Sequence, residues 1–274
     1  MDGPANTLPI GVFDSGVGGL TVLKAIHELL PAEDLLYLGD TARLPYGTKS
    51  PDSITRYARQ ATARLSGEGI KLLVVACNTA SAVALDVLRE ELDPLPVLGV
   101  VEPGATAAVA ARPGGRHLVL ATEATVRLGA YRRAVLARDP GARVAELACE
   151  LLVSLAEEGW TDGPIAPAIV RRYLDELGDE AVRPDSVILG CTHFPIIRDA
   201  IASVFDAGVA IVDSASTTAA ATRGRLDELG LANPGTGPGG LQLLATDGVR
   251  RFARVGGRFL GRDLKAEDIR LVDL

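Results

Sequence analysis

The chain has 274 residues, 47% of them hydrophobic and 23% charged, and a formal net charge of -7. This is the composition of a globular protein with a sizeable core, and the lack of a basic surplus argues against a nucleic-acid partner. No run is long and apolar enough to span a membrane, and the first residues show no secretory-signal pattern. We therefore expect a soluble, cytoplasmic protein without a membrane partner, whose three cysteines are free thiols.

Short apolar runs alternate with segments of helical spacing along the whole chain. Strands are expected at residues 9–13, 35–38, 71–76, 97–101, 117–121, 143–147, 186–190, 209–213, 241–245 and 269–272. Helices are expected at residues 19–30, 52–66, 79–92, 125–137, 164–177, 195–205, 216–229 and 248–260. Continuously apolar strands separated by helices predict an α/β fold with parallel sheets that are covered on both faces.

Two turns that contain Pro or Gly divide this series of elements. One is the DPLP segment before the strand at residue 97, and the other is the DAG turn that ends at residue 208. Such turns are typical places for the chain to cross between domains. We expect residues 1–98 and 208–274 to form one discontinuous domain and residues 99–207 to form a second.

A weak internal repeat, in which residues 9–26 resemble residues 117–134, predicts that these two domains are pseudo-symmetric. Cys77 in VVACNT and Cys191 in ILGCTH occupy similar places, each after an apolar run and before a helical segment. A two-fold arrangement would bring both thiols to one cleft, and a helix N-terminus lowers the pKa of a thiol. Taken singly, each cysteine suits simple packing, which is the interpretation we keep for Cys149. The pair favours a site with a thiol on either side of a substrate.

The glycine-rich turn DSGVGG follows the first strand and begins at Asp14. Its glycines allow a tight turn and a close approach of the backbone to a ligand. The spacing nearly matches a dinucleotide-binding fingerprint, with Asp40 placed as a ribose-binding acid, so a nucleotide-dependent oxidoreductase is one alternative. However, Thr21 stands where the third glycine belongs, and the Asp14 carboxylate suits an ammonium group better than a pyrophosphate. A purely structural turn is a further alternative.

Polar residues follow both thiols and can either bind a carboxylate or cap the next helix. They are Asn78 and Thr79 after the first thiol, and Thr192 and His193 after the second. His193 is placed to tune or protonate Cys191. A zinc site at Cys77, Cys191 and His193 is disfavoured because CxxC and HxxxH spacings are missing, so no metal is expected.

Two further segments are candidates for the same site. Thr122 and Thr125 follow the fifth strand at a helix start, where they can donate to an anion or act as caps. In the turn-rich loop at residues 39–50, Pro45, Tyr46 and Gly47 would stiffen the chain and offer backbone amides to a substrate.

Together these motifs resemble the cofactor-independent aspartate/glutamate racemase family over nearly the full chain. The matching segments, in the family's order, are IGVFDSGVGGLTV (10–22), GDTARLPYG (39–47), VVACNTASA (74–82), GVVEPG (99–104), ATEATV (121–126), ILGCTHFP (188–195) and IVDSA (211–215). The resemblance implies two pseudo-symmetric α/β domains with the active site in the cleft between them. It also implies glutamate as the small-molecule substrate, no cofactor, D-glutamate supply for bacterial peptidoglycan, and a homodimer.

By the same resemblance, Cys77 and Cys191 are the paired acid/bases, Cys77 acting on the D-enantiomer and Cys191 on the L-enantiomer. Asp14 and His193 assist them. Racemisation at Cα requires a base on one face and an acid on the other, which two thiols supply. Contacts to the substrate or to the thiols are implied for Asp14, Ser15, Tyr46, Gly47, Asn78, Thr79, Thr122, Thr125, Thr192 and His193.

The chain departs from the family pattern at two places. Ala121-Thr122 replaces the usual Gly-Thr, and Cys149-Glu150 replaces the usual Cys-Pro, which puts a charge near the expected edge of the cleft. An aspartate racemase of the same family is the nearest alternative function. A non-enzymatic two-domain binding module of the periplasmic type is disfavoured, because no secretory signal is found.

Overall fold

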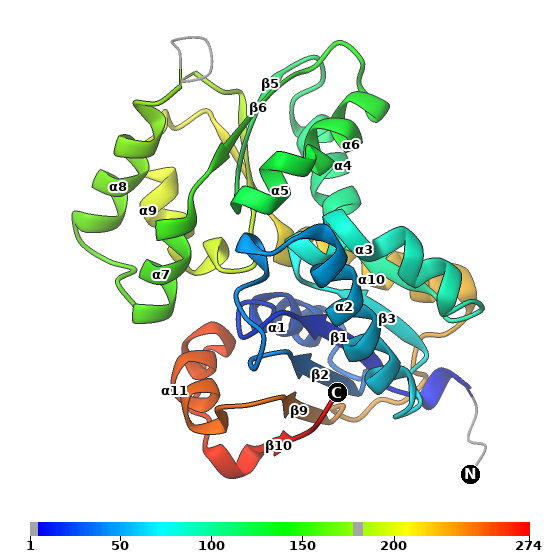
Figure 1. Ribbon diagram of the computed structural model, residues 1–274. Coiled ribbons are helices and arrows are strands. Elements are labelled where there is room, and N and C mark those ends of the chain that lie inside the picture. The colour runs from blue at the N-terminus through cyan, green and yellow to red at the C-terminus, as the bar shows by residue number, and fades with distance from the viewer. Residues whose placement is uncertain (1–4, 178–182) are drawn as a thin grey trace.

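The computed structural model of the protein describes residues 5–177 and 183–274, and its strands form two sheets (Figure 1). The larger sheet contains β1 (Ile10–Asp14), β2 (Leu35–Gly39), β3 (Leu72–Val75), β4 (Val97–Gly99), β9 (Leu241–Ala245) and β10 (Ile269–Leu271). The smaller sheet contains β5 (Arg116–Ala121), β6 (Arg143–Ala148), β7 (Ser186–Gly190) and β8 (Ala210–Asp213). The strand orders are β10-β9-β2-β1-β3-β4 and β6-β5-β7-β8, and neighbouring strands are parallel. Each predicted strand is present, and the predicted α/β class is confirmed.

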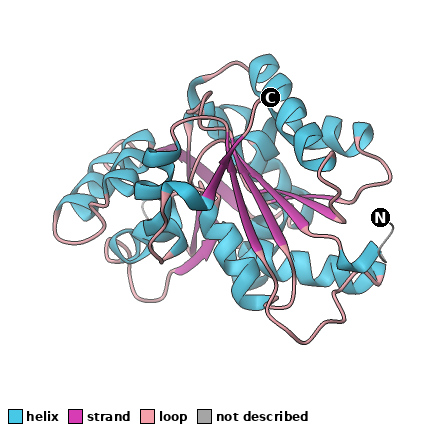
Figure 2. Cartoon of the chain, turned by 90° about the horizontal axis from the view of Figure 1, so that it is seen from below, coloured by secondary structure: helices cyan, strands magenta, loops and turns pink. Residues whose placement is uncertain are grey.

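Helices cover both faces of the sheets (Figure 2). The α-helices are α1 (Leu20–Leu29), α2 (Pro51–Ser66), α3 (Asn78–Glu91), α4 (Val101–Ala111), α5 (Glu123–Leu128), α6 (Ala130–Arg138), α7 (Glu150–Glu158), α8 (Ile165–Leu174), α9 (Arg198–Ala202), α10 (Ser214–Leu229) and α11 (Val249–Leu260). Short 3-10 helices are η1 (Ala5–Thr7), η2 (Tyr46–Thr48), η3 (Phe194–Ile197) and η4 (Ala266–Asp268).

Successive side chains along the strands of the larger sheet point to opposite faces. The strands therefore contribute apolar side chains to two cores, one on each face of the sheet. Val12 of β1 shares a core with Leu23 of α1 and Phe252 of α11. Its neighbour Phe13 belongs to the core on the other face, together with Ile54 of α2. All five strand residues of β1 are buried, as expected for a central parallel strand.

The smaller sheet is built in the same way. Leu118 of β5 shares a core with Leu152 of α7 and Ile201 of α9, whereas Val119 shares a core with Ala105 of α4 and Tyr131 of α6. The core of α7 and α9 is continuous with the core of α1 and α11 in the larger sheet. The two sheets therefore share one apolar cluster, which fixes the carboxyl ends of their strands relative to one another.

The predicted internal repeat is visible as topology. The order β2-β1-β3-β4 in the larger sheet recurs as β6-β5-β7-β8 in the smaller one, and β9 and β10 extend only the larger sheet. Cys77 follows the third strand of the first set, β3, and Cys191 follows the third strand of the second set, β7. The two thiols therefore occupy equivalent places in two pseudo-symmetric halves.

The sheet topology does not follow the predicted boundary at residue 208. The strand β8 lies after that boundary, yet it pairs with β7 in the smaller sheet, with Ser186 opposite Ala210. The turn at residues 206–208 merely joins α9 to β8. The crossing follows β8, where the Asp213 carboxylate accepts a hydrogen bond from the Ser216 amide at 2.8 Å and begins α10. We therefore propose that the second domain extends to Asp213.

Several helices also differ from the predictions. The helix expected at residues 125–137 is two helices, because Gly129 adopts a left-handed conformation with φ of 59° and ends α5. The segment 195–205 is η3 followed by α9. Helices α4 and α7 were not predicted from the sequence. Pro103 lies in the first turn of α4, where a missing amide proton costs no helical hydrogen bond, and the short apolar run of α7 is ambiguous between helix and strand.

Candidate active site

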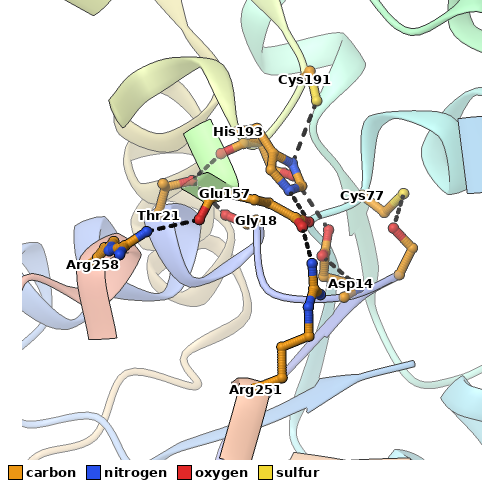
Figure 3. A network of polar contacts seen from close by, with 12 residues as sticks. Asp14, Gly18, Thr21, Cys77, Glu157, Cys191, His193, Arg251 and Arg258 are labelled. Carbon is orange, nitrogen blue, oxygen red and sulfur yellow. Dashed lines mark hydrogen bonds and ion pairs between the residues drawn. The ribbon is translucent and has the colours of Figure 1, made fainter. Parts of the chain in front are cut away.

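Cys77 lies at the N-terminus of α3, where its buried side chain acts as the N-cap. The sulfur accepts a hydrogen bond from the Ala80 amide at 3.4 Å, and the thiol donates to Ser15 Oγ at 3.4 Å (Figure 3). Burial and the negative charge of Asp14 nevertheless raise the pKa of Cys77 to about 12. The sequence-based expectation of a lowered pKa is therefore wrong for Cys77, because desolvation of the thiolate outweighs the helix N-terminus.

Cys191 follows β7 and lies next to a buried histidine. Its sulfur is 3.7 Å from His193 Nδ1, and His193 Nε2 is 3.2 Å from Glu157 Oε1. Although burial lowers the pKa of His193, the hydrogen bonds to Cys191 and Glu157 raise it to about 10. A protonated imidazole therefore faces the Cys191 sulfur at neutral pH and offers it a charge-assisted hydrogen bond.

The glycine-rich turn after β1 lies between the two cysteine turns. Gly16 N donates to Asp14 Oδ2 at 2.8 Å, and the fully buried Asp14 has a pKa that burial raises while the charge of His193 lowers it. A side chain on Gly18 would overlap the imidazole of His193, so this position requires glycine. Thr21 Oγ1 donates to Thr192 O at 2.9 Å. The first half of the molecule is thus in direct contact with the second cysteine turn.

The same contacts bring the two thiols into one electrostatic environment. The charge of Cys191 contributes to the raised pKa of Cys77, and Thr192 Oγ1 donates to Asp14 Oδ1 at 3.5 Å. Figure 3 shows Cys191 beside His193 and Cys77 near Asp14. The structure therefore brings together the four residues predicted to be catalytic.

Asn78 carries a buried amide that is only half satisfied. Its Oδ1 accepts a hydrogen bond from the Tyr131 hydroxyl at 2.6 Å, whereas its Nδ2 has no hydrogen-bond partner in the described part of the chain. A buried donor without a partner costs free energy of about 1–3 kcal/mol, unless a ligand accepts from it. The Asn78 amide therefore suits a substrate carboxylate.

Three threonine hydroxyls form a cluster beside this amide. Thr79 Oγ1 is 2.9 Å from Thr122 Oγ1 and 3.3 Å from Thr125 Oγ1, and the last two are 3.0 Å apart. Thr122 is the N-cap residue of α5 but makes no side-chain cap hydrogen bond. Because Thr79 belongs to α3, whereas Thr122 precedes α5 and Thr125 lies within it, the cluster joins the two halves of the molecule.

The loop with the predicted Pro45, Tyr46 and Gly47 reaches the same cluster. A side chain on Gly47 would lie 3.1 Å from Thr122 Cβ, whereas Pro45 is exposed before η2. The Tyr46 hydroxyl donates to the buried Asp40 carboxylate at 2.6 Å, which also accepts from Thr246 and Arg43. Asp40 is thus occupied by protein groups, which disfavours the ribose-binding role considered for it.

Four residues around the site were not predicted to belong to it: Tyr131, Glu150, Glu157 and Arg251. Glu150, noted in the sequence only as a departure, accepts a hydrogen bond from the Glu123 amide at 2.5 Å and lies 3.3 Å from a side chain placed on Gly47. It therefore carries its charge to the edge of the threonine cluster. Glu157 and Tyr131 gave no signal in the sequence, because each lies on a helix among ordinary surface or core residues.

Other predictions concern groups outside this site. Cys149 is buried and its thiol donates to Leu147 O at 3.6 Å, in agreement with a packing role. Within residues 5–177 and 183–274, no group of three or more His, Cys, Asp or Glu side chains is arranged to hold a metal ion. No helix in these ranges is long and apolar enough to cross a membrane.

Two buried thiols follow equivalent strands of two pseudo-symmetric α/β halves, with a buried carboxylate and an imidazole beside them, and these are groups that an acid–base isomerase needs. Residues 10–222 match the family model described as Asp/Glu/Hydantoin racemase, and the chain belongs to that family. The predicted family resemblance is confirmed.

Individual relatives agree with this membership. A glutamate racemase of Geobacter metallireducens is 48% identical over 255 residues, which are 93% of each chain. The structure of glutamate racemase from Francisella tularensis in complex with D-glutamate has a TM-score of 0.88 at 34% identity and covers 98% of both chains. The enzyme from Thermus thermophilus in complex with β-chloro-D-alanine has a TM-score of 0.87 at 44% identity, again over 98% of both chains.

Proposed function

We propose that this chain is a glutamate racemase that interconverts L- and D-glutamate by proton transfer between Cys77 and Cys191, without a cofactor. The observation that carries the proposal is the equivalence of the two thiols. Each follows the third strand of its half. The turn after Asp14 contacts Cys77 through Ser15 and approaches His193, the partner of Cys191, through Gly18. The relatives named above support glutamate as the substrate, and the donors around Asn78 suit its carboxylate.

The two sulfurs must be in different protonation states, because one removes a proton and the other returns one. Cys77, whose pKa is raised to about 12, is the thiol in the free enzyme. In this proposal Cys191, whose sulfur faces the His193 imidazole, is the base toward L-glutamate. The family resemblance assigns the same enantiomer to Cys191.

In the forward step the Cys191 thiolate takes the α-proton of L-glutamate. The Cα–H bond breaks, its electron pair delocalises into the α-carboxylate, and the Cys77 thiol delivers its proton to the opposite face. Cys191 is then the thiol and Cys77 the thiolate, which is the state that D-glutamate requires for the reverse reaction.

The α-proton is weakly acidic, so preorganised donors must stabilise the charge that develops on the carboxylate. Asn78 Nδ2, which has no partner in the described part of the chain, and the amides of the first turn of α3 support this role. The buried Asp14 carboxylate suits the substrate ammonium group. We further propose that the product supplies D-glutamate for bacterial peptidoglycan. A cytoplasmic location and a homodimer both stay predictions.

Proton exchange with the solvent tests this function directly. The purified enzyme is incubated in D2O with L-glutamate or D-glutamate, and circular dichroism and mass spectrometry follow inversion and deuterium at Cα. We expect the inverted product to carry deuterium without any added cofactor. Cys77→Ala and Cys191→Ala should each abolish inversion, whereas the matched control Cys149→Ala should retain it. Parental turnover in either of the first two variants, or a strict requirement for pyridoxal phosphate, would refute the proposal. Aspartate as the better substrate would select the alternative racemase.

A further inference from the structure

Helix α11 of the first half reaches across to the second cysteine turn. Arg251 Nη2 donates to Glu157 Oε2 at 2.6 Å, and Arg258 Nη1 donates to Glu157 O at 2.9 Å (Figure 3). The ring of Phe259 meets the imidazole of His193 edge-on, with 5.2 Å between centroids. The two arginines are seven residues apart and so lie on one side of the helix. One helix thus holds α7 of the second half by both a side chain and the main chain.

The two carboxylate oxygens of Glu157 have partners in different halves of the molecule. Its Oε1 faces His193 Nε2 at 3.2 Å, while its Oε2 accepts from Arg251. The Glu157 side chain is 16% exposed and that of Arg251 is 49% exposed, so the carboxylate is mostly buried and its arginine partner is about half exposed. A side chain with two fixed partners has one orientation, and this orientation decides where His193 Nδ1 points.

We propose that Arg251 is a positioning residue for proton transfer at Cys191. By holding Glu157 across the boundary between the halves, it orients the His193 imidazole toward the Cys191 sulfur, and it does so only while α11 and α7 are in contact. The catalytic geometry of the second thiol is thereby made to depend on the closed arrangement of the two halves. This inference rests on the proposed function, in which Cys191 transfers a proton.

The charged groups around the His193 imidazole indicate how its pKa should change when Arg251 is removed. His193 faces Cys191 on its own turn, Asp14 on β1 and Glu157 on α7, with Arg251 of α11 behind Glu157. Although burial raises the pKa of Glu157, His193 and Arg251 together lower it to about 2. Without the guanidinium, Glu157 interacts with His193 alone. The pKa of His193 should therefore rise, while the carboxylate loses its second fixed partner.

The test compares Arg251→Met with two matched variants. Arg251→Lys keeps the charge, and Arg258→Met removes an arginine that contacts only the main chain of Glu157. For each variant, kcat and KM are measured, and kcat is followed against pH to locate the basic limb of the pH profile. The His193 imidazole is titrated by NMR. His27 and His117 serve as internal references in the same spectrum.

We expect Arg251→Met to lower kcat about tenfold, the usual effect of removing a partner that orients a histidine, with a smaller change in KM. The basic limb and the pKa of His193 should move upward together, and Arg251→Lys should restore both. Arg258→Met should leave the pKa of His193 unchanged. The proposal would be overturned if Arg251→Met kept both the parental kcat and the parental pKa of His193. It would also be overturned if kcat fell while the pKa of His193 did not change.

The two proposals fail in different ways. The imidazole titration requires no turnover, so a shifted pKa of His193 in Arg251→Met would stand even if the thiol variants showed that Cys77 and Cys191 are not the bases. Conversely, inactive Cys77→Ala and Cys191→Ala variants would support the racemase proposal, and an unchanged pKa of His193 in Arg251→Met would at the same time reject the role of Arg251.

Discussion

The two thiols occupy equivalent places in the fold, yet their surroundings differ. Cys77 is set between a serine, a helix amide and the buried carboxylate of Asp14, and burial with that carboxylate raises its pKa. Cys191 is set beside His193, whose pKa burial lowers and the hydrogen bonds to Cys191 and Glu157 raise. The strand topology is therefore repeated in the two halves, whereas the polar surroundings of the two thiols are not.

The largest difference between the halves should appear when the imidazole is removed. We expect His193→Asn to lower kcat about 10²- to 10³-fold, because Cys191 loses its charged partner. The matched change in the other half, Ser15→Ala, should cost about tenfold or less, because Ser15 makes only a neutral hydrogen bond to Cys77. Rates for both enantiomers are measured by circular dichroism.

The enantiomers have equal free energy in water, so any variant must change kcat/KM equally in the two directions. The asymmetry between the halves therefore shows in kcat and KM taken separately. Equal losses in His193→Asn and Ser15→Ala would mean that the two thiols are electrostatically equivalent after all.

Alkylation rates sharpen the comparison at Cys77. Only the thiolate reacts with iodoacetamide, and with a pKa of about 12 Cys77 should react slowly at pH 8 and faster as the pH rises. Asp14→Asn removes the negative charge that raises this pKa, so the thiolate fraction at pH 8 should increase, by about tenfold for each unit of lowered pKa. Mass spectrometry of the peptide that contains Cys77 gives the rate. An unchanged rate in Asp14→Asn would show that burial alone sets the pKa.

A smaller effect is expected at Asn78, the amide proposed to bind the substrate carboxylate, because its partner Tyr131 belongs to the other half of the molecule. Tyr131→Phe removes the hydroxyl that donates to Asn78 Oδ1 and so frees the amide to rotate. We expect KM for glutamate to rise about three- to tenfold with little change in kcat, and stability to fall by about 1 kcal/mol, the usual worth of one hydrogen bond. Steady-state kinetics and thermal unfolding measure the two effects. A fall in kcat at constant KM would contradict a role in substrate binding.

Much of the site was predictable because its motifs are contiguous. Cys77 with Asn78 and Thr79, and Cys191 with Thr192 and His193, are read from single short segments, since a strand, a turn and a helix start need only neighbouring residues. Both sheets follow from apolar runs in the same way. The predicted boundary at residue 208 differs from the one we propose at Asp213, because a turn that links two elements of one domain has the same composition as a linker.

The partners of these motifs could not be predicted. Glu157 lies 36 residues before His193, and Arg251 lies 94 residues after Glu157. Each is an ordinary charged residue on a helix surface until the fold places it. Tyr131 is likewise 53 residues from the amide that it orients.

The sequence by itself determined the α/β class, the two turns that carry Cys77 and Cys191, and the resemblance to one family. Apolar strand runs and turn motifs are local patterns that can be recognised without the fold. Only the tertiary structure decided which groups surround each thiol. Desolvation and the nearest carboxylate or imidazole set the pKa of a buried group, and these depend on contacts between segments far apart in the chain. The same holds for the arginine of α11, whose contact exists only where the two halves meet.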